Sequence, residues 1–385
     1  MSPTRQMKIL TLSNYFPEHV GGIEFVAYNL VKHWRKHHQV RWIASDVKMR
    51  PHLYEPDDVH IHTSNFTEEH LGFPYPIPLG NSLFQIFNQV RWSDVVQIHD
   101  CLYSANVIAF WASRLYKKPL LITQHAALAD FPVPYKRALQ WLAYKTLGRM
   151  ILENAEQVVF ISSRVKSWFE NWTRIKHQAL FIPNGVDHNV FYPLTPEERE
   201  LRRAQLGYTA DQIVLLFVGR FAENKGIQYV HAIAQSRSNY HWLMLGHGAI
   251  NPHEWGLPNI RVIPPQSQAE LQRYYSAADL FILPSVGEGF PLSVQEALSC
   301  GLPVAVSQET ANFLSDSPLL KLDITSLPDM LQLLDDLFSD RKRISSLRTE
   351  SKEYAQRWDW EKVAESYETL FNKIIGLHTT PDNEA

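Results

Sequence analysis

The chain has 385 residues, of which 45% are apolar and 20% are charged. This length allows two domains of ordinary size, and the composition is typical of a globular protein and excludes an intrinsically disordered one. The formal net charge of −3 at pH 7 gives the chain no strong attraction to nucleic acid, so we expect no nucleic-acid partner.

Cysteine content and hydropathy indicate the compartment. Only two cysteines occur, Cys101 and Cys300, which argues against a disulfide framework and suits a reducing cytoplasm. No stretch approaches the roughly 20 apolar residues of a membrane-spanning helix. Residues 1–6 also lack the apolar core of a secretory signal. We therefore expect a cytoplasmic protein.

The first predicted strand covers 7–13, and a segment with helical spacing follows at 23–38. The loop between them carries Gly21 and Gly22 at a place where open α/β sheets bind ligands. Glycines there permit close backbone approach at a helix start, although a flexible turn is the alternative. They do not form the G-x-G-x-x-G pattern of dinucleotide-binding proteins, which argues against a Rossmann dehydrogenase.

Two buried strands are predicted at 94–99 and 120–123. The first ends in His99 and Asp100, and His125 follows the second. A single histidine is usually a structural group with its hydrogen bonds satisfied. Two histidines at equivalent strand ends favour a ligand position, because parallel sheets bind ligands at that edge.

A helix is predicted over 135–154, with one basic face. Arg137, Trp141, Lys145 and Arg149 recur every four residues and therefore share a stripe. Such a stripe can lie on anionic lipid headgroups. A solvated helix face with one packed ring is the more ordinary interpretation, and both remain open.

A second sheet is predicted to begin with a strand at 213–219. The following loop carries two cations five residues apart, Arg220 and Lys225. Arginine offers a planar fork and lysine a point charge, and both suit a diphosphate. Two solvated surface cations are the ordinary alternative. A later strand ends in a G-x-G at Gly246, and another is predicted at 259–264.

The stretch 279–306 reads as an apolar strand, a turn rich in Gly, Pro and Ser, a helix from about Pro291 to Cys300, and a second apolar strand from Val304. This order is that of a parallel α/β unit.

The turn within this unit has the chemistry of a phosphate site. Pro291 suits the first helical turn, and backbone N–H groups of 289–293 would face the loop, where the helix dipole favours an anion. Glu288 stands between two glycines, and Glu296 lies further along the helix. Amides for phosphate and two carboxylates for hydroxyl groups suit a phosphorylated sugar.

Four motifs occur together. E-G-F-P-L-S-V-Q-E at 288–296 has two glutamates separated by seven residues; the others are F-V-G-R-F-A-E-N-K-G at 217–226, I-P-N-G-V-D at 182–187 and the glycine pair 21–22. Together they resemble the signature of retaining glycosyltransferases with the GT-B fold, specifically glycosyltransferase family 4 (group 1). The resemblance runs over nearly the whole chain.

The resemblance implies an α/β fold of two Rossmann-like domains that face each other across a cleft. It implies an N-terminal acceptor-binding domain over 1–188 and a C-terminal nucleotide-sugar-binding domain over 189–356. Residues 357–385 would form a helix that crosses back to the first domain.

The resemblance also implies roles for single residues. Arg220 and Lys225 would hold the donor diphosphate and stabilise its charge as it leaves. Glu288 would orient the sugar hydroxyls, and His125 would lie near the donor sugar. Further donor contacts are expected from Gly22, Gly246, Ile263, Gly289, Phe290, Pro291, Leu292, Ser293 and Glu296, with Glu296 on the ribose.

His99 and Asp100 are weaker candidates for contact with the acceptor. Several relatives act on lipid-linked acceptors at the inner membrane surface, which makes the stripe on 135–154 a candidate for peripheral membrane contact. No Asp-x-Asp pair occurs in the sequence, so we expect the cationic side chains to replace a metal and expect no cofactor.

The expected function is transfer of a sugar from a UDP- or GDP-sugar to a hydroxyl of a glycan or glycolipid, in the synthesis of cell-surface polysaccharide or glycolipid. A nucleotide-sugar epimerase of the same fold and a non-catalytic sugar-nucleotide binder are the alternatives. The non-catalytic binder is disfavoured because four charged candidate site residues occur together, namely Arg220, Lys225, Glu288 and Glu296.

Overall fold

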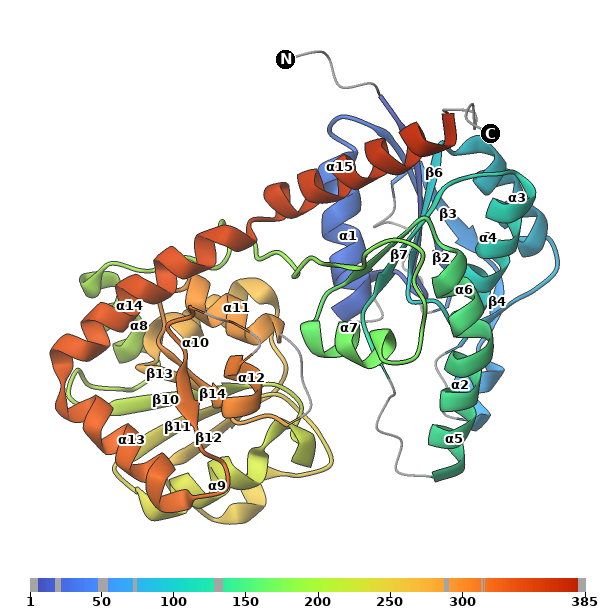
Figure 1. Cartoon of the computed structure of the whole chain (residues 1–385). Helices are drawn as coiled ribbons and strands as arrows, with labels where there is room; N and C mark the ends of the chain where they lie inside the picture. The colour runs from blue at the N-terminus through green and yellow to red at the C-terminus, as the bar shows by residue number, and fades with distance from the viewer. Residues whose placement is uncertain are drawn as a thin grey trace. The chain divides into compact units, whose positions relative to one another are not determined.

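The computed structural model describes residues 6–17, 22–47, 55–71, 75–127, 134–286, 291–312, 314 and 316–379. The chain forms two compact units, one of Met1–Asn184 with Trp360–Ala385 and one of Gly185–Asp359 (Figure 1). The resemblance implied boundaries at 188 and 356.

The first unit is built on a seven-stranded sheet in which every neighbouring pair is parallel, with the order β3-β2-β1-β6-β7-β8-β9. Its strands are β1 (Lys8–Leu12), β2 (Gln39–Ser45), β3 (Asp58–Ile61), β6 (Val95–His99), β7 (Leu120–Gln124), β8 (Gln157–Phe160) and β9 (Leu180–Phe181). Strands β6 and β7 are buried throughout, as expected for a parallel sheet covered on both faces. A separate two-stranded antiparallel sheet consists of β4 (Thr63–Ser64) and β5 (Ile77–Pro78), which follow β3 in the sequence.

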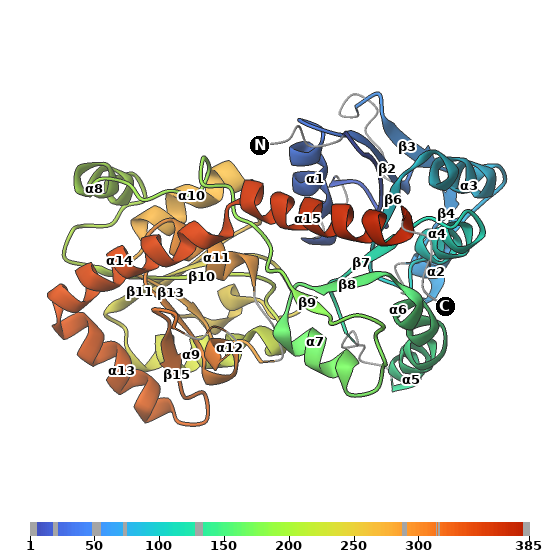
Figure 2. The same cartoon turned by 45° about the horizontal axis from the view of Figure 1, so that its top comes forward.

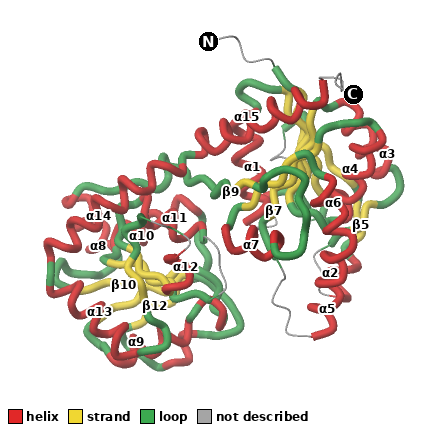
Figure 3. The backbone as a smooth tube through the Cα atoms, in the orientation of Figure 1, coloured by secondary structure: helices red, strands yellow, loops and turns green. Residues whose placement is uncertain are grey.

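Helices cover both faces of this sheet (Figure 3). The helices of the first unit are α1 (Gly22–Trp34), α2 (Phe66–Leu71), α3 (Ser82–Trp92), α4 (Ser104–Leu115), α5 (Pro134–Ala143), α6 (Arg149–Asn154), α7 (Ser163–Glu170) and α15 (Trp360–Thr379). Alternate strand residues face opposite sides. Thus Leu10 of β1 joins a core with α3, α4, α6 and α7, while Ile9 joins a core with α1 and α15.

The C-terminal helix α15 packs on α1 of the first unit (Figure 2). The indole Nε1 of Trp34 donates to the carbonyl of Ala364 at 3.2 Å. The same ring meets Phe371 edge-on, with centroids 5.1 Å apart. Both aromatic residues are fully buried, so this contact closes one face of the sheet.

The segment predicted as one helix over 135–154 contains α5, a π-helical turn over Tyr144–Gly148, and α6. Hydrogen bonds from i to i+5 widen the helical repeat. The four-residue spacing from Trp141 through Lys145 to Arg149 therefore does not keep these side chains on one straight stripe. The sequence alone did not indicate this turn.

The second unit has a six-stranded parallel sheet with the order β12-β11-β10-β13-β14-β15. Its strands are β10 (Ile213–Val218), β11 (Tyr240–Leu245), β12 (Ile260–Ile263), β13 (Leu280–Leu283), β14 (Val304–Ser307) and β15 (Leu320–Leu322). Its helices are α8 (Pro196–Gln205), α9 (Ile227–Ser236), α10 (Gln268–Ala277), α11 (Leu292–Ser299), α12 (Gln308–Asn312), α13 (Leu327–Ser339) and α14 (Arg341–Ala355).

One hydrophobic core fills the second unit. Strands β10 and β13 lie at its centre, and the apolar faces of α9, α11 and α14 pack against the sheet. Two parallel α/β units with helices on both faces confirm the predicted fold class of two Rossmann-like domains.

Candidate active site

Two histidines meet at the carboxyl edge of the first sheet. His99 is the last residue of β6, and His125 follows β7, its parallel neighbour. The Nδ1 of His99 lies 2.8 Å from the Nε2 of His125, a hydrogen-bonding distance. Burial lowers the pKa of both imidazoles, that of His125 to about 3. The two rings are therefore a neutral pair, with one donor and one acceptor at the contact.

Asp100 follows β6 and closes the turn next to this pair. Its Oδ1 accepts the backbone N–H of His125 at 2.8 Å and that of Ala126 at 3.4 Å. Its φ is 65°, in the left-handed region that aspartate tolerates better than most residues. Burial raises the pKa of its carboxyl to about 7, although the backbone hydrogen bonds oppose this. A buried carboxyl that titrates near neutrality can accept or share a hydroxyl proton.

Glu24 is another buried carboxyl in the first unit, and it was not among the predicted site residues. It lies in the first turn of α1, and burial raises its pKa to about 7. Its charge also raises the pKa values of Asp100 and Tyr103, so the three groups interact electrostatically. Gly22, at the start of the same helix, is exposed, and a Cβ there would meet no heavy atom within 4 Å. Gly21 lies outside the described residues.

The cationic loop of the second unit lies at the carboxyl end of β10. Arg220 is exposed after this strand, and Lys225 ends a 3₁₀ turn, Glu223–Lys225, before α9. Gly226 is the N-cap residue of α9 and has φ 73°, and a Cβ there would meet the carbonyl oxygen of Pro284 at 2.1 Å. The tight turn that carries Lys225 therefore packs against the chain that leaves β13.

A hydrogen bond joins the same two segments. The backbone N–H of Val286 donates to the carbonyl of Asn224 at 2.9 Å. The loop with the two cations and the start of the glycine-rich turn are thus held together at one edge of the sheet. Glu288, Gly289 and Phe290, in that turn, lie outside the described residues.

A cavity of about 250 Å³ opens at this edge. It is lined by Val218, Gly219, Arg220, Leu245, Gly246, His247, Pro265, Gln266 and Leu271. Ile263, one of the expected donor contacts, is buried in the core and is not among these lining residues. Pro265 and Gln266, just beyond β12, line the cavity instead.

The packing of the protein itself requires a glycine at position 246. Its φ is 150°, and a Cβ would meet the carbonyl oxygen of Gly219 at 1.9 Å. The close approach made possible by this glycine is therefore between two strand ends of the protein. The interpretation of this glycine as a ligand contact rests only on its position in the cavity wall.

Helix α11 begins after Pro291, which is its N-cap residue. The carbonyl of Pro291 accepts from the N–H groups of Val294 at 3.0 Å and Gln295 at 3.5 Å. The N–H groups of Leu292 and Ser293 precede these bonds and are the ones that helix geometry leaves unused. They follow directly on the glycine-rich turn, as an anion site at a helix start requires.

Glu296 lies within the same helix and is buried. Its Oε2 accepts the phenol hydrogen of Tyr275 at 2.7 Å. Burial raises its carboxyl pKa to about 7, and the Tyr275 hydrogen bond opposes this. The tyrosine fixes one carboxylate oxygen, so the orientation of this side chain is set without a ligand.

The basic side chains that were predicted to form one stripe in the first unit make different contacts. Lys145 lies over the rings of Trp172 and Trp141, 4.2 and 5.4 Å from their centroids. Arg149 pairs with Glu153 at 2.9 Å. Arg137 is exposed.

Among the described helices, none is long and apolar enough to cross a membrane. The described residues also contain no group of three or more His, Cys, Asp or Glu placed to hold a metal ion.

The chain is similar to known glycosyltransferases in sequence. It is 27% identical to a D-inositol 3-phosphate glycosyltransferase of Xylanimonas cellulosilytica, over 71% of this chain and 70% of that protein. It is 23% identical to a GDP-mannose:cellobiosyl-diphosphopolyprenol alpha-mannosyltransferase of Xanthomonas oryzae pv. oryzae, over 96% and 98% of the two chains.

Solved structures share the fold. A sucrose-phosphate synthase from Thermosynechococcus elongatus has a TM-score of 0.76 at 20% identity, with 97% of this chain and 100% of that chain covered. Anabaena HepE in complex with UDP and glucose has a TM-score of 0.73 at 17% identity, with 96% and 100% covered. These likenesses confirm the GT-B fold.

Family models match both units of the chain. The model described as Glycosyltransferase Family 4 matches residues 20–190, and that described as Glycosyl transferases group 1 matches residues 212–317. With the motifs, the fold and the relatives in agreement, the chain belongs to glycosyltransferase family 4 (group 1) and is an enzyme of the hexosyl-transferring class.

Proposed function

We propose that this glycosyltransferase moves a sugar from a UDP- or GDP-sugar to a hydroxyl of a glycan or lipid-linked glycan, with retention at the anomeric carbon and without a metal. The observation that carries the proposal is the junction of two loops in the second unit. The loop with Arg220 and Lys225 is joined to the segment leaving β13 by the hydrogen bond from Val286 to Asn224.

This junction has the chemistry that a nucleoside diphosphate needs. Two cations and the N–H groups of Leu292 and Ser293 follow strand ends on the same sheet edge. Cations and amides both bind phosphate oxygens, and they stabilise the diphosphate more strongly as it gains charge on leaving. Glu296, oriented by Tyr275, suits the ribose hydroxyls. UDP bound to Anabaena HepE, which has the same fold, supports a nucleotide donor.

The first unit supplies groups for the acceptor. Asp100 and Glu24 are buried carboxyls whose pKa values are raised to about 7, which suits hydrogen bonds to a neutral hydroxyl. The neutral His125 suits a hydrogen bond to the donor sugar, because its pKa is lowered to about 3. Sugar hydroxyls are uncharged, and neutral partners bind them without an uncompensated buried charge.

The reaction then balances without an added base. The bond from the anomeric carbon to the diphosphate oxygen breaks, and a bond to the acceptor oxygen forms on the same face. The acceptor proton passes to the departing phosphate oxygen. Arg220 and Lys225 stabilise the charge that remains on the nucleoside diphosphate.

The test is a panel of UDP- and GDP-sugars, with release of nucleoside diphosphate followed in the presence and absence of acceptor extract. Release that requires acceptor is expected, and the Lys225→Ala variant gives the background. Conversion to an altered sugar nucleotide without acceptor would make the protein an epimerase. Saturable nucleotide binding with no release under any condition would leave it a sugar-nucleotide binder.

We also propose that α5 contacts an anionic membrane surface at the cytoplasmic face. Tyr135, Leu139 and Leu142 are 64%, 55% and 52% exposed and share one face of α5, whereas the exposed cation Arg137 projects from the opposite face. An exposed apolar face opposed by a cationic one is typical of a helix lying in a lipid interface. The mannosyltransferase of Xanthomonas oryzae, whose name specifies a diphosphopolyprenol acceptor, supports a lipid-linked substrate.

Sedimentation with vesicles tests the membrane contact. Vesicles containing phosphatidylglycerol are expected to bind the protein, and a Leu139→Gln, Leu142→Gln double variant should bind them less. Leu201→Gln is the matched control, because Leu201 is 62% exposed on α8 of the second unit. Equal sedimentation of all three proteins, or none with anionic vesicles, would remove α5 from the proposal.

A further inference from the structure

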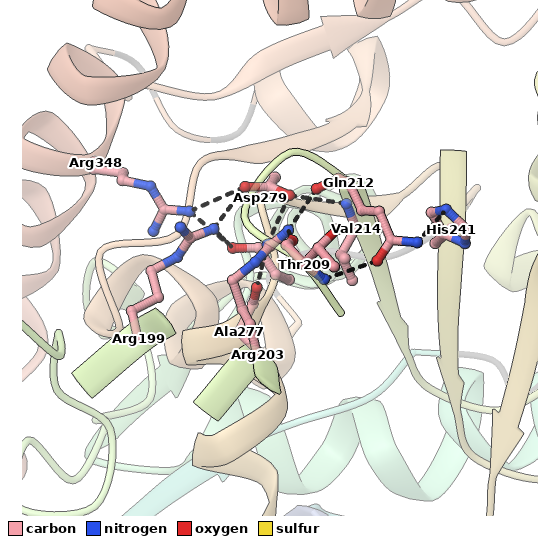
Figure 4. A network of polar contacts seen from close by, with 10 residues as sticks. Arg199, Arg203, Thr209, Gln212, Val214, His241, Ala277, Asp279 and Arg348 are labelled. Carbon is pink, nitrogen blue, oxygen red and sulfur yellow. Dashed lines mark hydrogen bonds and ion pairs between the residues drawn. The ribbon is translucent and has the colours of Figure 1, made fainter. Parts of the chain in front are cut away.

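A cluster of three arginines surrounds one aspartate in the second unit. Asp279 precedes β13 and accepts hydrogen bonds from Arg199 at 2.6 Å, from Arg203 at 3.0 Å and from the backbone N–H of Val214 at 2.8 Å (Figure 4). Arg203 is buried and also donates to the carbonyls of Ala277, Thr209 and Gln212. These hydrogen bonds give Arg203 a structural role, because they join the segments that meet at this edge of the sheet.

Arg348 is held differently. It comes from α14 and donates to the carbonyl of Ala278 at 2.8 Å and to that of Gly301 at 3.5 Å. Its distance to Asp279 is 4.0 Å, so it makes an ion pair but no hydrogen bond with the carboxylate. Burial and the charge of Arg199 lower its pKa to about 9. One carboxylate therefore faces three guanidinium groups, and carbonyl dipoles at the ends of α10 and α11 offset only part of the excess charge.

A cavity of about 390 Å³ lies against this excess charge. Arg199, Arg348 and Lys352 line it, together with Glu200 and Thr349. The cations come from two helices, α8 and α14. Its wall carries three positive side chains against one negative one, and its volume is that of a small-ligand pocket.

The cavity is separate from the donor-site residues. Asp279 and Val214 lie at the amino ends of β13 and β10, whereas Arg220 and the glycine-rich turn follow the carboxyl ends of the same strands. The two places therefore lie at opposite edges of one sheet. A ligand in this cavity would not occupy the proposed nucleotide site.

We propose that this cavity is a second anion site, which binds a phosphate-bearing small molecule. Arg199 donates through Nη2 to Ala278 and Asp279, and Arg348 donates through Nη2 to Ala278 and through Nη1 to Gly301. A guanidinium has five N–H donors, so each side chain keeps further donors that can bind a phosphate oxygen. A dianion would neutralise the excess charge that the cluster carries. Lys352, one turn beyond Arg348 on α14, adds a point charge at the same wall.

Titration calorimetry with inorganic phosphate, at constant ionic strength set by chloride, tests this site. The donor-site variant Lys225→Ala is included so that phosphate binding at the two sites is distinguished. Saturable binding is expected in Lys225→Ala, about tenfold weaker binding in Lys225→Ala with Arg348→Gln, and a smaller loss in Lys225→Ala with Lys352→Gln. Lys352 is exposed, so its substitution leaves folding intact if Arg348→Gln does not.

Two results would overturn the site. The first is the absence of saturable phosphate binding in Lys225→Ala. The second is a phosphate affinity in the double variant of Lys225→Ala with Lys352→Gln that equals the affinity in Lys225→Ala. Competition between phosphate and glucose 6-phosphate then separates the possible sources of the group. Displacement at lower concentration by the sugar phosphate indicates an organic phosphate, and equal potency indicates free phosphate. Loss of phosphate binding in Lys225→Ala alone would support the donor site and reject this one.

Discussion

At the scale of single residues, the contact between His99 and His125 makes a sharp prediction. Both imidazoles have lowered pKa values, so each is neutral and holds one proton. The contact at 2.8 Å joins a ring N–H to a bare ring nitrogen, so the tautomer of His125 is coupled to that of His99. We propose that His99 is a positioning residue for His125. The ¹⁵N shifts of His125 should report one tautomer and no titration between pH 5 and 8.

Two substitutions test that role. His99→Phe keeps a ring but removes the nitrogen, and should allow His125 to exchange tautomers and lower kcat about tenfold or more, with donor affinity unchanged. His99→Asn places an amide near the original Nδ1 and should restore much of both. Identical ¹⁵N shifts in wild type and His99→Phe, or titration of His125 near pH 6.5 in the wild type, would contradict the pairing.

Arg220 and Lys225 carry the second prediction at this scale. Each would make charge-assisted hydrogen bonds to the departing diphosphate, worth roughly 1.5–3 kcal/mol per contact. Arg220→Ala and Lys225→Ala should each lower kcat/KM by about 10- to 150-fold, measured by nucleoside diphosphate release. Lys342→Ala, at an exposed position on α14, is the matched control. Wild-type rates for both site variants would exclude them from the site.

Some site residues could be predicted from the sequence and others could not, depending on whether a local pattern determines their position in the fold. His99 and His125 follow two apolar runs, and parallel pairing brings such ends to one edge, so their approach was predictable. Glu24 was not found, because a glutamate in a first helical turn is the ordinary complement of the helix dipole. Its electrostatic partners, Asp100 and Tyr103, are distant in sequence. No local pattern carries that information.

At the scale of elements, the turn between β10 and α9 gives a prediction about positioning. Gly226→Ala would place a Cβ at 2.1 Å from the carbonyl oxygen of Pro284, so one of the two loops must move. The expected results are lower stability and weaker binding of the nucleoside diphosphate, measured by thermal unfolding and calorimetry. The weakening should exceed what backbone strain alone produces.

Gly207→Ala is the control for that strain. Gly207 has φ 84°, and a Cβ there would meet no heavy atom within 4 Å, so this variant costs about 1 kcal/mol of left-handed strain and nothing more. Nucleotide affinity should stay at the wild-type value in Gly207→Ala. Equal loss of affinity in the two variants would mean that the contact with Pro284 does not position Lys225.

Most strands could be predicted because parallel strands buried on both faces read as short apolar runs, as β10 and β13 do. Two details could not. Strands β3 and β4 are separated by a single residue but belong to different sheets. The π-helical turn over Tyr144–Gly148 depends on tertiary packing, since Tyr144 is buried among the rings of Trp168 and Phe169. Periodicity cannot show either feature.

At the scale of the whole molecule, the pH dependence of folding combines opposing groups. The pKa of Asp100 is raised to about 7 by burial, whereas an unfolded aspartate titrates near pH 4. The native state therefore binds more protons than the unfolded state between about pH 4 and 7, and this contribution to stability is lost as pH rises through that window. His99 and His125 act oppositely, because their lowered pKa values favour folding as pH rises towards 6.5.

Asp100→Asn isolates the carboxyl from these opposing contributions. The amide oxygen can still accept the N–H groups of His125 and Ala126, and asparagine tolerates the φ of 65°. Each pKa unit is worth about 1.4 kcal/mol, so the variant should gain about 2–3 kcal/mol relative to wild type between pH 5 and 8. Urea unfolding at both pH values measures this. The control Asp323→Asn, whose exposed carboxyl has a lowered pKa, should show no such gain. Parallel pH profiles for Asp100→Asn and wild type would mean that Asp100 is charged in the folded protein, so that the proposed acceptor contact would come from an ionised carboxylate.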